Sequence, residues 1–270
     1  MLFDTHCHLQ ESVFDGDIGR VLERALASGV CGITLCGYDA SANVKTLEMA
    51  ATSELLHAAV GYHPHEAKDV TAAQLVELDT LASLPEVVCV GEIGLDFFRD
   101  HSPEGAQRRI LDSQLDIAVR TKKPVSVHSR GAEDAIYSHL ARYSAACGWR
   151  PGQREIGVMH CFGGDLDQAR GYVALGFGIS VACPITYPAN NKARMMAREL
   201  PLESLVVETD SPYLPPQPFR GQRNEPAHVR YAVDAIAAAR GLPAEMVAEA
   251  TTNNAARLFG VRLPAGAATW

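Results

Sequence analysis

The segment Leu2-Phe3-Asp4-Thr5-His6-Cys7-His8-Leu9 opens the chain as a short, largely apolar run with polar side chains near its end. This pattern predicts a buried strand over Leu2–Leu9. The residues that follow recur at helical spacing, with Asp17 placed to cap a helix and Gly29 placed to end it. The apolar face of that helix carries Ile18, Val21, Leu22, Ala25 and Leu26. A strand followed by an amphipathic helix is the repeating unit of a parallel sheet.

The same unit occurs eight times along the chain. Each predicted strand precedes a helical pattern, and the strands are Leu2–Leu9, Gly32–Cys36, Ala58–Pro64, Val87–Leu95, Pro124–Ser129, Ile156–Phe162, Phe177–Ala182 and Leu205–Asp210. Eight such units predict an α/β fold, a closed (β/α)8 TIM barrel that forms a single domain over residues 1–270. An open doubly wound sheet is the alternative. No glycine-rich phosphate-binding loop follows a strand, which disfavours that alternative and predicts no nucleotide cofactor.

The composition is that of an ordinary soluble globular protein. The formal net charge is −8, from 24 basic and 32 acidic residues. This charge disfavours long-range capture of nucleic acid or of an anionic membrane, although it is compatible with a local basic patch. The N-terminal segment lacks the basic start and apolar run of a signal peptide, and we predict no membrane segment. Seven cysteines, an odd number without Cys-x-x-Cys spacing, are typical of reduced thiols in a cytoplasmic protein.

Side chains that bind metals stand at the ends of six of the eight predicted strands. In strand order they are His6 with His8, His63 followed by His65, Glu92, His128, His160 and Asp210. A barrel places its active site at the C-terminal ends of its strands, so we expect these residues to converge.

Side-chain alternation gives the expected directions of these residues. With a period of two, His6 and His8 point the same way as Asp4. The opposite side is then expected to carry Phe3, Thr5, Cys7 and Leu9. The same rule groups His128 with Ser126, and Asp210 with Glu208. We expect the apolar sides to face the surrounding helices.

Imidazole nitrogens and carboxylate oxygens are ligands for zinc, manganese, iron or nickel, and carboxylates also suit magnesium. Four histidines and two carboxylates suffice for two ions. A carboxylate such as Glu92 can bridge two cations about 3.5–4 Å apart, which activates water for attack on a phosphoryl or acyl centre. The pattern therefore predicts a hydrolase.

Several residues have two interpretations. His63 and His65 flank Pro64 and either serve the site or form a turn. Glu208 either orients a ligand or belongs to an interior ion pair. Two further groups are read as structural or packing residues, namely His57, His101, His139 and His228, and Cys7, Cys31, Cys36 and Cys89.

Taken together, the strand-end segments resemble the TatD family of metal-dependent hydrolases, a branch of the amidohydrolase-like barrels. The resemblance spans nearly the whole chain. The segments that carry it are Phe3 to Leu9, Gly61-Tyr62-His63-Pro64-His65, Gly91-Glu92-Ile93-Gly94-Leu95-Asp96, Pro124 to Ala132, His160-Cys161-Phe162-Gly163-Gly164, Glu208-Thr209-Asp210-Ser211-Pro212-Tyr213-Leu214, and Arg223-Asn224-Glu225-Pro226. Glu92 stands where related branches bridge their metals with a carboxylated lysine.

The resemblance implies a site with two divalent metal ions, which could be Mg, Mn or Zn. One ion would be bound by His6, His8, Glu92 and Asp210, and the other by Glu92, His128 and His160. Asp210 would accept the proton of the attacking water, and His63 would lie near the scissile group. TatD-like proteins are cytoplasmic deoxyribonucleases that trim DNA from the 3′ end. The residues expected to contact such a substrate are His65, Arg99, Arg130 and Arg223, with Arg220 in the same loop region.

Some positions depart from the family pattern. Gln10 and Glu11 stand where an aspartate often follows the first motif, and Phe98 replaces a frequent tyrosine. The segment Pro212 to Gly221 is the part that the resemblance determines least. Two alternatives to a nuclease remain open: a hydrolase of a small phosphoester or amide metabolite, and a non-catalytic accessory protein with a structural metal site. A structural metal site is normally closed with four ligands, which disfavours the second alternative.

Overall fold

The computed structural model describes residues 1–264, and in that part of the chain eight parallel strands form one sheet. Each strand pairs with the next in chain order. The strands are β1 (Leu2–Cys7), β2 (Val30–Cys36), β3 (Leu56–Val60), β4 (Val87–Asp96), β5 (Val125–Arg130), β6 (Gly157–Met159), β7 (Phe177–Ala182) and β8 (Leu205–Glu208). The predicted barrel is confirmed, and the open-sheet alternative is wrong.

The barrel closes just beyond the end of β8. Cys7 and Ser211 form a single parallel bridge. The Asp210 amide donates to the His6 carbonyl at 2.9 Å, and the His8 amide donates to the Ser211 carbonyl at 2.7 Å. The seam between the first and last strands therefore lies among the predicted site residues and fixes their backbones relative to one another.

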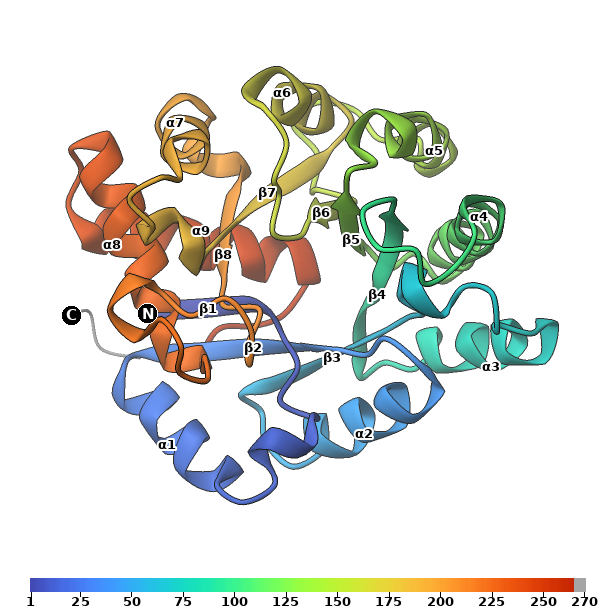
Figure 1. Cartoon of the computed structure of the whole chain (residues 1–270), viewed down its shortest axis with the longest axis horizontal. Coiled ribbons are helices and arrows are strands. Elements are labelled where there is room, and N and C mark those ends of the chain that lie inside the picture. The colour runs from blue at the N-terminus through green and yellow to red at the C-terminus, as the bar shows by residue number, and fades with distance from the viewer. Residues whose placement is uncertain (265–270) are drawn as a thin grey trace.

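Helices surround the strands (Figure 1). They are α1 (Ile18–Ala27), α2 (Ala40–Ala50), α3 (Ala72–Ala82), α4 (Glu104–Thr121), α5 (Glu133–Cys147), α6 (Leu166–Ala174), α7 (Asn191–Glu199), α8 (Val229–Arg240) and α9 (Ala244–Phe259). Gly29 ends the first helical segment with a φ of 82°. Asp17 is the N-cap residue of α1, but its side chain makes no capping hydrogen bond, because it accepts hydrogen bonds from Arg223 instead. Within residues 1–264, no helix is long and apolar enough to cross a membrane.

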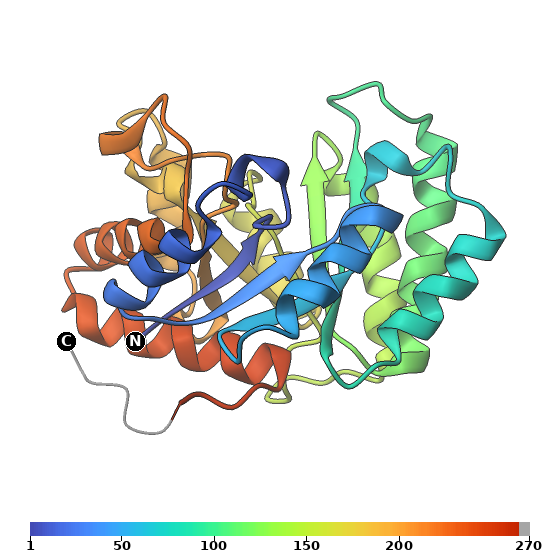
Figure 2. The ribbon, with the colours of Figure 1, turned by 90° about the horizontal axis from the view of Figure 1, so that it is seen from below.

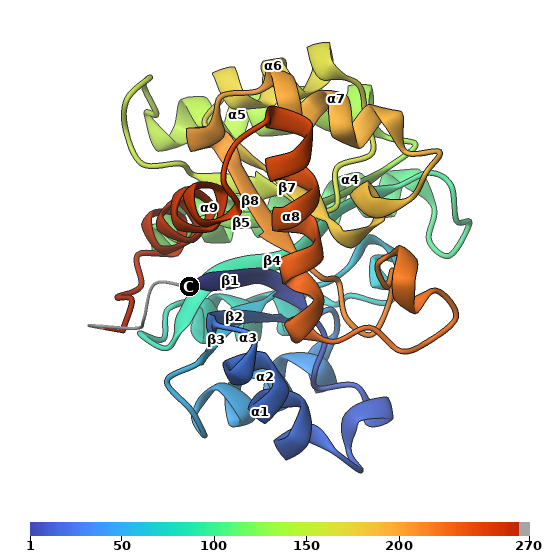
Figure 3. The same ribbon diagram turned by 90° about the vertical axis from the view of Figure 1, so that its left-hand side faces the viewer.

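Apolar side chains fill the barrel beneath the strand ends. Phe3 packs in one buried cluster with Ala59, Cys89, Val158 and Val206 from four other strands, and with Ala255, Leu258 and Phe259 of α9. This helix lies under the barrel, on the side away from the strand tips (Figure 2). Figure 3 shows α8 and α9 side by side next to β1 and β8, which agrees with their contacts. The polar site therefore rests on a packed apolar base.

Strand β1 does not keep the predicted alternation. Its pairing with β2 shifts register between Asp4 and Cys7, which is the signature of a bulge. Phe3 packs inside the barrel, and the Thr5 hydroxyl lies 3.5 Å from the hydroxyl of Ser180 on the distant strand β7. The expectation that Phe3 and Thr5 point away from His6 is therefore wrong, because the bulge changes the direction of the side chains. The other two residues expected on that side, Cys7 and Leu9, do pack in the outer apolar layer.

Candidate active site

The strand ends surround a cavity of about 630 Å³. Most of the predicted site residues line this cavity: His8, His63, His65, Glu92, Arg99, His128, Arg130, His160 and Asp210. His6 is fully buried beneath them and contacts Glu92 and His8. Residues from both halves of the sequence thus meet at one end of the barrel.

The Glu92 carboxylate lies between two groups of histidines. Its Oε2 atom is 3.4 Å from Nε2 of His6 and 3.6 Å from Nε2 of His8. Its Oε1 atom is 2.9 Å from Nδ1 of His128 and 3.7 Å from Nε2 of His160. Each carboxylate oxygen therefore faces its own set of nitrogens, which is the arrangement that a bridging ligand requires.

Asp210 lies near one histidine of each group. Its Oδ1 atom is 3.6 Å from Nε2 of His8 and 4.0 Å from Nε2 of His160. The backbone φ of Asp210 is 57°, in the left-handed region that aspartate and asparagine tolerate better than most residues. Backbone strain of this kind is concentrated at functional sites, where the surrounding structure holds it in place.

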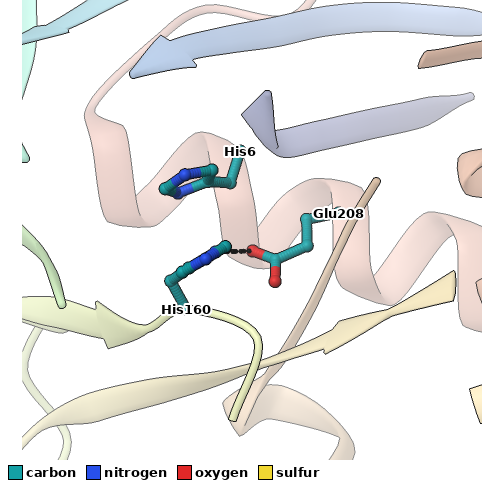
Figure 4. Close-up of side chains that lie close together, drawn as sticks. All are labelled: His6, His160 and Glu208. Carbon is teal, nitrogen blue, oxygen red and sulfur yellow. Dashed lines mark ion pairs between the residues drawn. The ribbon is translucent and has the colours of Figure 1, made fainter. Parts of the chain in front are cut away.

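Three histidines direct their Nε2 atoms at this centre. Nδ1 of His8 is 2.8 Å from the Cys36 carbonyl oxygen, which can only accept, so this nitrogen carries the hydrogen of the neutral ring. Nδ1 of His160 faces a carboxylate oxygen of Glu208 at 3.1 Å (Figure 4). Nδ1 of His6 lies 3.2 Å from the hydroxyl of Ser126. The three Nε2 atoms lie around Glu92 while the Nδ1 atoms have partners of their own, so these residues fit a divalent metal, which would displace any hydrogen on Nε2.

Glu208 both orients a histidine and belongs to an interior ion pair, the two roles considered for it above. Its carboxylate is fully buried, pairs with His160, and also accepts a hydrogen bond from the Cys161 amide at 2.6 Å. Figure 4 shows the Glu208 side chain directed at the His160 ring, with His6 beside it. The His6 and His160 rings are stacked with their centroids 3.6 Å apart. Glu208 therefore holds the orientation of His160 through an interior ion pair.

We expect Glu208→Gln to weaken metal binding by roughly 10- to 100-fold, because partners that orient ligand histidines typically contribute this much. The amide keeps the shape of the side chain but removes the charge that faces His160. Calorimetric titration of the chelator-stripped protein with Mn²⁺ or Zn²⁺ measures the effect, and the melting temperature reports any loss of folding. An affinity equal to that of the unmodified protein would contradict the orienting role.

The carboxylates and imidazoles shift one another's pKa. Burial alone would raise the pKa of Glu92, but His63, His6, His160 and the hydrogen bond with His128 hold it well below its usual range. Burial likewise opposes the lowered pKa of Asp210, which the hydrogen bond with His8 and the charge of His160 produce. The acidic groups outweigh burial at His160 and raise its pKa to about 10. Both carboxylates are therefore ionised at neutral pH, and the centre stabilises positive charge.

His63 has a different protonation pattern. Burial lowers its pKa to about 3, so the ring is neutral at pH 7. Its Nδ1 atom accepts a hydrogen bond from the His65 amide at 3.1 Å, which places the ring hydrogen on Nε2. That Nε2 atom is 3.5 Å from Oε1 of Glu92. His63 thus presents a hydrogen-bond donor to the cavity rather than a lone pair.

Asp96 is a site residue that the sequence analysis did not single out. One oxygen of its buried carboxylate contacts Nε2 of His65 at 2.9 Å and Nε2 of His128 at 3.2 Å. The other oxygen accepts hydrogen bonds from the amides of Phe98 and Arg99, both at 2.9 Å. Asp96 follows Glu92 by four residues in one strand, and the period-two rule that grouped the other ligands could have identified it.

The structure separates the predicted arginines. Arg99 and Arg130 line the cavity. Arg223 does not, because its guanidinium pairs with Asp17 at 2.7 Å, donates to the Val13 carbonyl and stacks on Phe14. It ties the loop after β8 to the start of α1, and these contacts occupy its guanidinium. Arg220 is likewise outside the cavity and stacks over Tyr187 at 4.5 Å.

The cavity wall also includes residues that sequence reasoning missed, namely Glu11, Tyr38, Glu66, His101 and Tyr213. The Tyr213 hydroxyl donates to Glu11 at 2.6 Å, so these two side chains form one side of the mouth. The ring of His101, interpreted above as structural, lies 4.5 Å from the ring of His65. None of these residues belongs to a spacing pattern, so only the folded chain reveals their position.

Residues 3–260 match the sequence model of the family described as TatD related DNase. The uncharacterized metal-dependent hydrolase YjjV of Escherichia coli K12 is 38% identical, and the match covers 96% of this chain and 97% of that protein. The crystal structure of YjjV superposes with a TM-score of 0.89 at 37% identity, covering 97% of this chain and 98% of that one. A protein of Rahnella sp. (strain Y9602) named 3′-5′ ssDNA/RNA exonuclease TatD is 32% identical over 96% of this chain and 98% of its own length.

Proposed function

Because the chain belongs to the TatD family of metal-dependent hydrolases, we propose that it is a 3′-5′ exonuclease that hydrolyses the phosphodiester bonds of single-stranded DNA. The observation that carries this proposal is the Glu92 carboxylate, which directs one oxygen to each of two groups of histidines. The preference for DNA and the direction of digestion rest on the family description and on the name of the Rahnella relative.

We assign two divalent ions to the site. His6, His8, Glu92 and Asp210 would hold one of them, and the other would be held by Glu92, His128 and His160. When bound, such ions polarise the phosphoryl group and lower the pKa of a water molecule. The orientation of His6, His8 and His160 supports this assignment, since their Nε2 atoms face the shared carboxylate.

Asp210 and His63 are proposed to move the protons. The Asp210 carboxylate is ionised at neutral pH and can accept the proton that the attacking water loses. His63 is neutral with its hydrogen on Nε2, so it can donate a hydrogen bond to the developing charge on the leaving oxygen. The lowered pKa of each group leaves both without their titratable proton at neutral pH: Asp210 is then a carboxylate that can accept a proton, and His63 is a neutral ring that keeps one hydrogen, on Nε2.

Two further features support the proposed substrate and a cytoplasmic location of the protein. Arg99 and Arg130 supply positive charge at the cavity wall, where they can bind phosphates in a protein of formal net charge −8. All seven cysteines, which lie within the described residues, are free thiols. A reducing compartment such as the cytoplasm suits that state.

The proposal predicts that chelation abolishes hydrolysis and that added Mg²⁺, Mn²⁺ or Zn²⁺ restores it. The assay combines chelator-stripped protein with a 5′-labelled and a 3′-labelled single-stranded oligonucleotide, and with a small phosphodiester reporter. Digestion from the 3′ end yields a ladder from the 5′-labelled strand and immediate release of the label from the 3′-labelled strand.

Other outcomes of this assay contradict specific parts of the proposal. Turnover that survives exhaustive metal removal would overturn the metal-dependent mechanism. Cleavage of the reporter with intact DNA would favour the small-phosphoester alternative, and a reversed labelling result would overturn the direction. No reaction with any substrate would favour an amide hydrolase or a non-catalytic protein.

A further inference from the structure

The connection between β4 and α4 carries an aromatic side chain at the rim of the cavity. Phe98 is 64% exposed. The guanidinium carbon of Arg130 lies 4.1 Å from its ring centroid, and that of Arg99 lies 5.8 Å away. Both arginines line the cavity. Figure 2 shows this connection projecting beyond the ends of the strands. We call Phe98, Arg99 and Arg130 the rim platform.

Packing does not account for the exposed ring. The neighbouring Phe97 is partly buried against the core, and Arg108 covers it at 5.1 Å. Phe98 instead leaves most of its surface in water, although burying a phenylalanine side chain stabilises a protein by roughly 1.5–3 kcal/mol. An aromatic ring held open beside two arginines offers one surface for a flat base and another for phosphate.

The rim platform is tied to the metal-binding residues through Asp96. This carboxylate is 1% exposed, and it fixes the backbone amides of Phe98 and Arg99 with one oxygen. Its other oxygen contacts the ring of His128, which in turn contacts Glu92. The backbone that carries Phe98 and Arg99 is therefore connected to Glu92 through Asp96 and His128.

We propose that Phe98 is a stacking platform for a base of a single-stranded nucleic acid, with Arg99 and Arg130 binding the adjoining phosphates. This inference rests on the proposed function. Phe98 itself lies outside the cavity wall, so the stacked base belongs to a nucleotide next to the one being removed. Stacking on an aromatic ring accepts every base, because each base has a π-face, and this suits an enzyme that digests any sequence.

The test compares Phe98→Ala and Phe98→Tyr with the unmodified protein. Phe98→Ala is expected to raise KM for a 5′-labelled oligonucleotide roughly 10-fold, because it removes the stacking surface. Phe98→Tyr restores the ring and is expected to restore KM. The rate with methyl p-nitrophenyl phosphate, which has no nucleobase to stack on residue 98, is expected to stay unchanged in both variants. Tyr137→Ala is the matched control, since Tyr137 is an exposed aromatic residue of α5 outside the cavity wall.

A second substrate tests whether the base itself is responsible for the effect. An oligonucleotide with an abasic residue next to its 3′-terminal nucleotide is expected to raise KM for the unmodified protein by the same factor, and to have no further effect on Phe98→Ala. An unchanged KM for Phe98→Ala on the intact oligonucleotide would overturn the stacking role, as would an equal loss on the small phosphodiester. If the unmodified protein shortens no oligonucleotide, the proposed function fails and this inference fails with it. Shortening without any effect at Phe98 defeats this inference alone.

Discussion

Glu92→Gln is expected to lower kcat by about 10³-fold or more. The substitution keeps the size of the side chain but removes its negative charge. In the unmodified protein, one carboxylate oxygen faces His6 and the other faces His128. Metal ions supply several kcal/mol of transition-state stabilisation, and each 1.36 kcal/mol corresponds to a tenfold change in rate. Loss of the shared ligand is therefore expected to remove most of the activity, because it weakens both sites at once.

The measurement combines kcat with the metal content of the purified variant. We expect fewer bound ions than in the unmodified protein, with a melting temperature that shows the variant to be folded. Glu249→Gln is a suitable control, since it makes the same change at an exposed position of α9. A Glu92→Gln variant that hydrolyses substrate at a near-native rate would rule out the bridging role.

The fold could be read from the sequence because strand-helix units leave few topological choices. Strand β7 has its predicted bounds, Phe177–Ala182, while β6 is shorter than predicted and covers only Gly157–Met159. The convergence of the polar residues at one end of the barrel could also be predicted from the sequence. All strands of a parallel barrel run the same way, so a residue at the end of β1 meets one at the end of β5 whatever lies between them.

The features that could not be read from the sequence depend on contacts between distant segments. The bulge in β1 arises in its pairing with β2, and it redirects Phe3 and Thr5. Arg223 resembled a phosphate ligand, but Asp17, about two hundred residues earlier, takes its guanidinium. A spacing rule has no access to either contact, because each depends on how segments are placed in the folded barrel.

Asp210→Asn is expected to lower kcat by roughly 10²- to 10⁴-fold, the usual contribution of a general base. The amide oxygen of asparagine can still approach a cation, but it cannot take the proton of the attacking water. Asparagine is also the best replacement for this backbone, since it tolerates the left-handed φ of 57° that alanine would strain. The expected loss therefore reflects proton transfer rather than misfolding.

The signature of this role is a fall in kcat with little change in metal binding, which distinguishes Asp210 from Glu92. Calorimetric titration with Mn²⁺ should give a dissociation constant within about tenfold of the unmodified protein, since one oxygen ligand is replaced by another. Asp69→Asn, at an exposed position, controls for the loss of one negative charge. If kcat and metal affinity fall together, Asp210 acts chiefly as a ligand, and the proton passes to another group. If kcat is unchanged, the Asp210 carboxylate is neither the proton acceptor nor an essential metal ligand. Its contribution is then limited to the backbone hydrogen bond with His6 at the barrel seam.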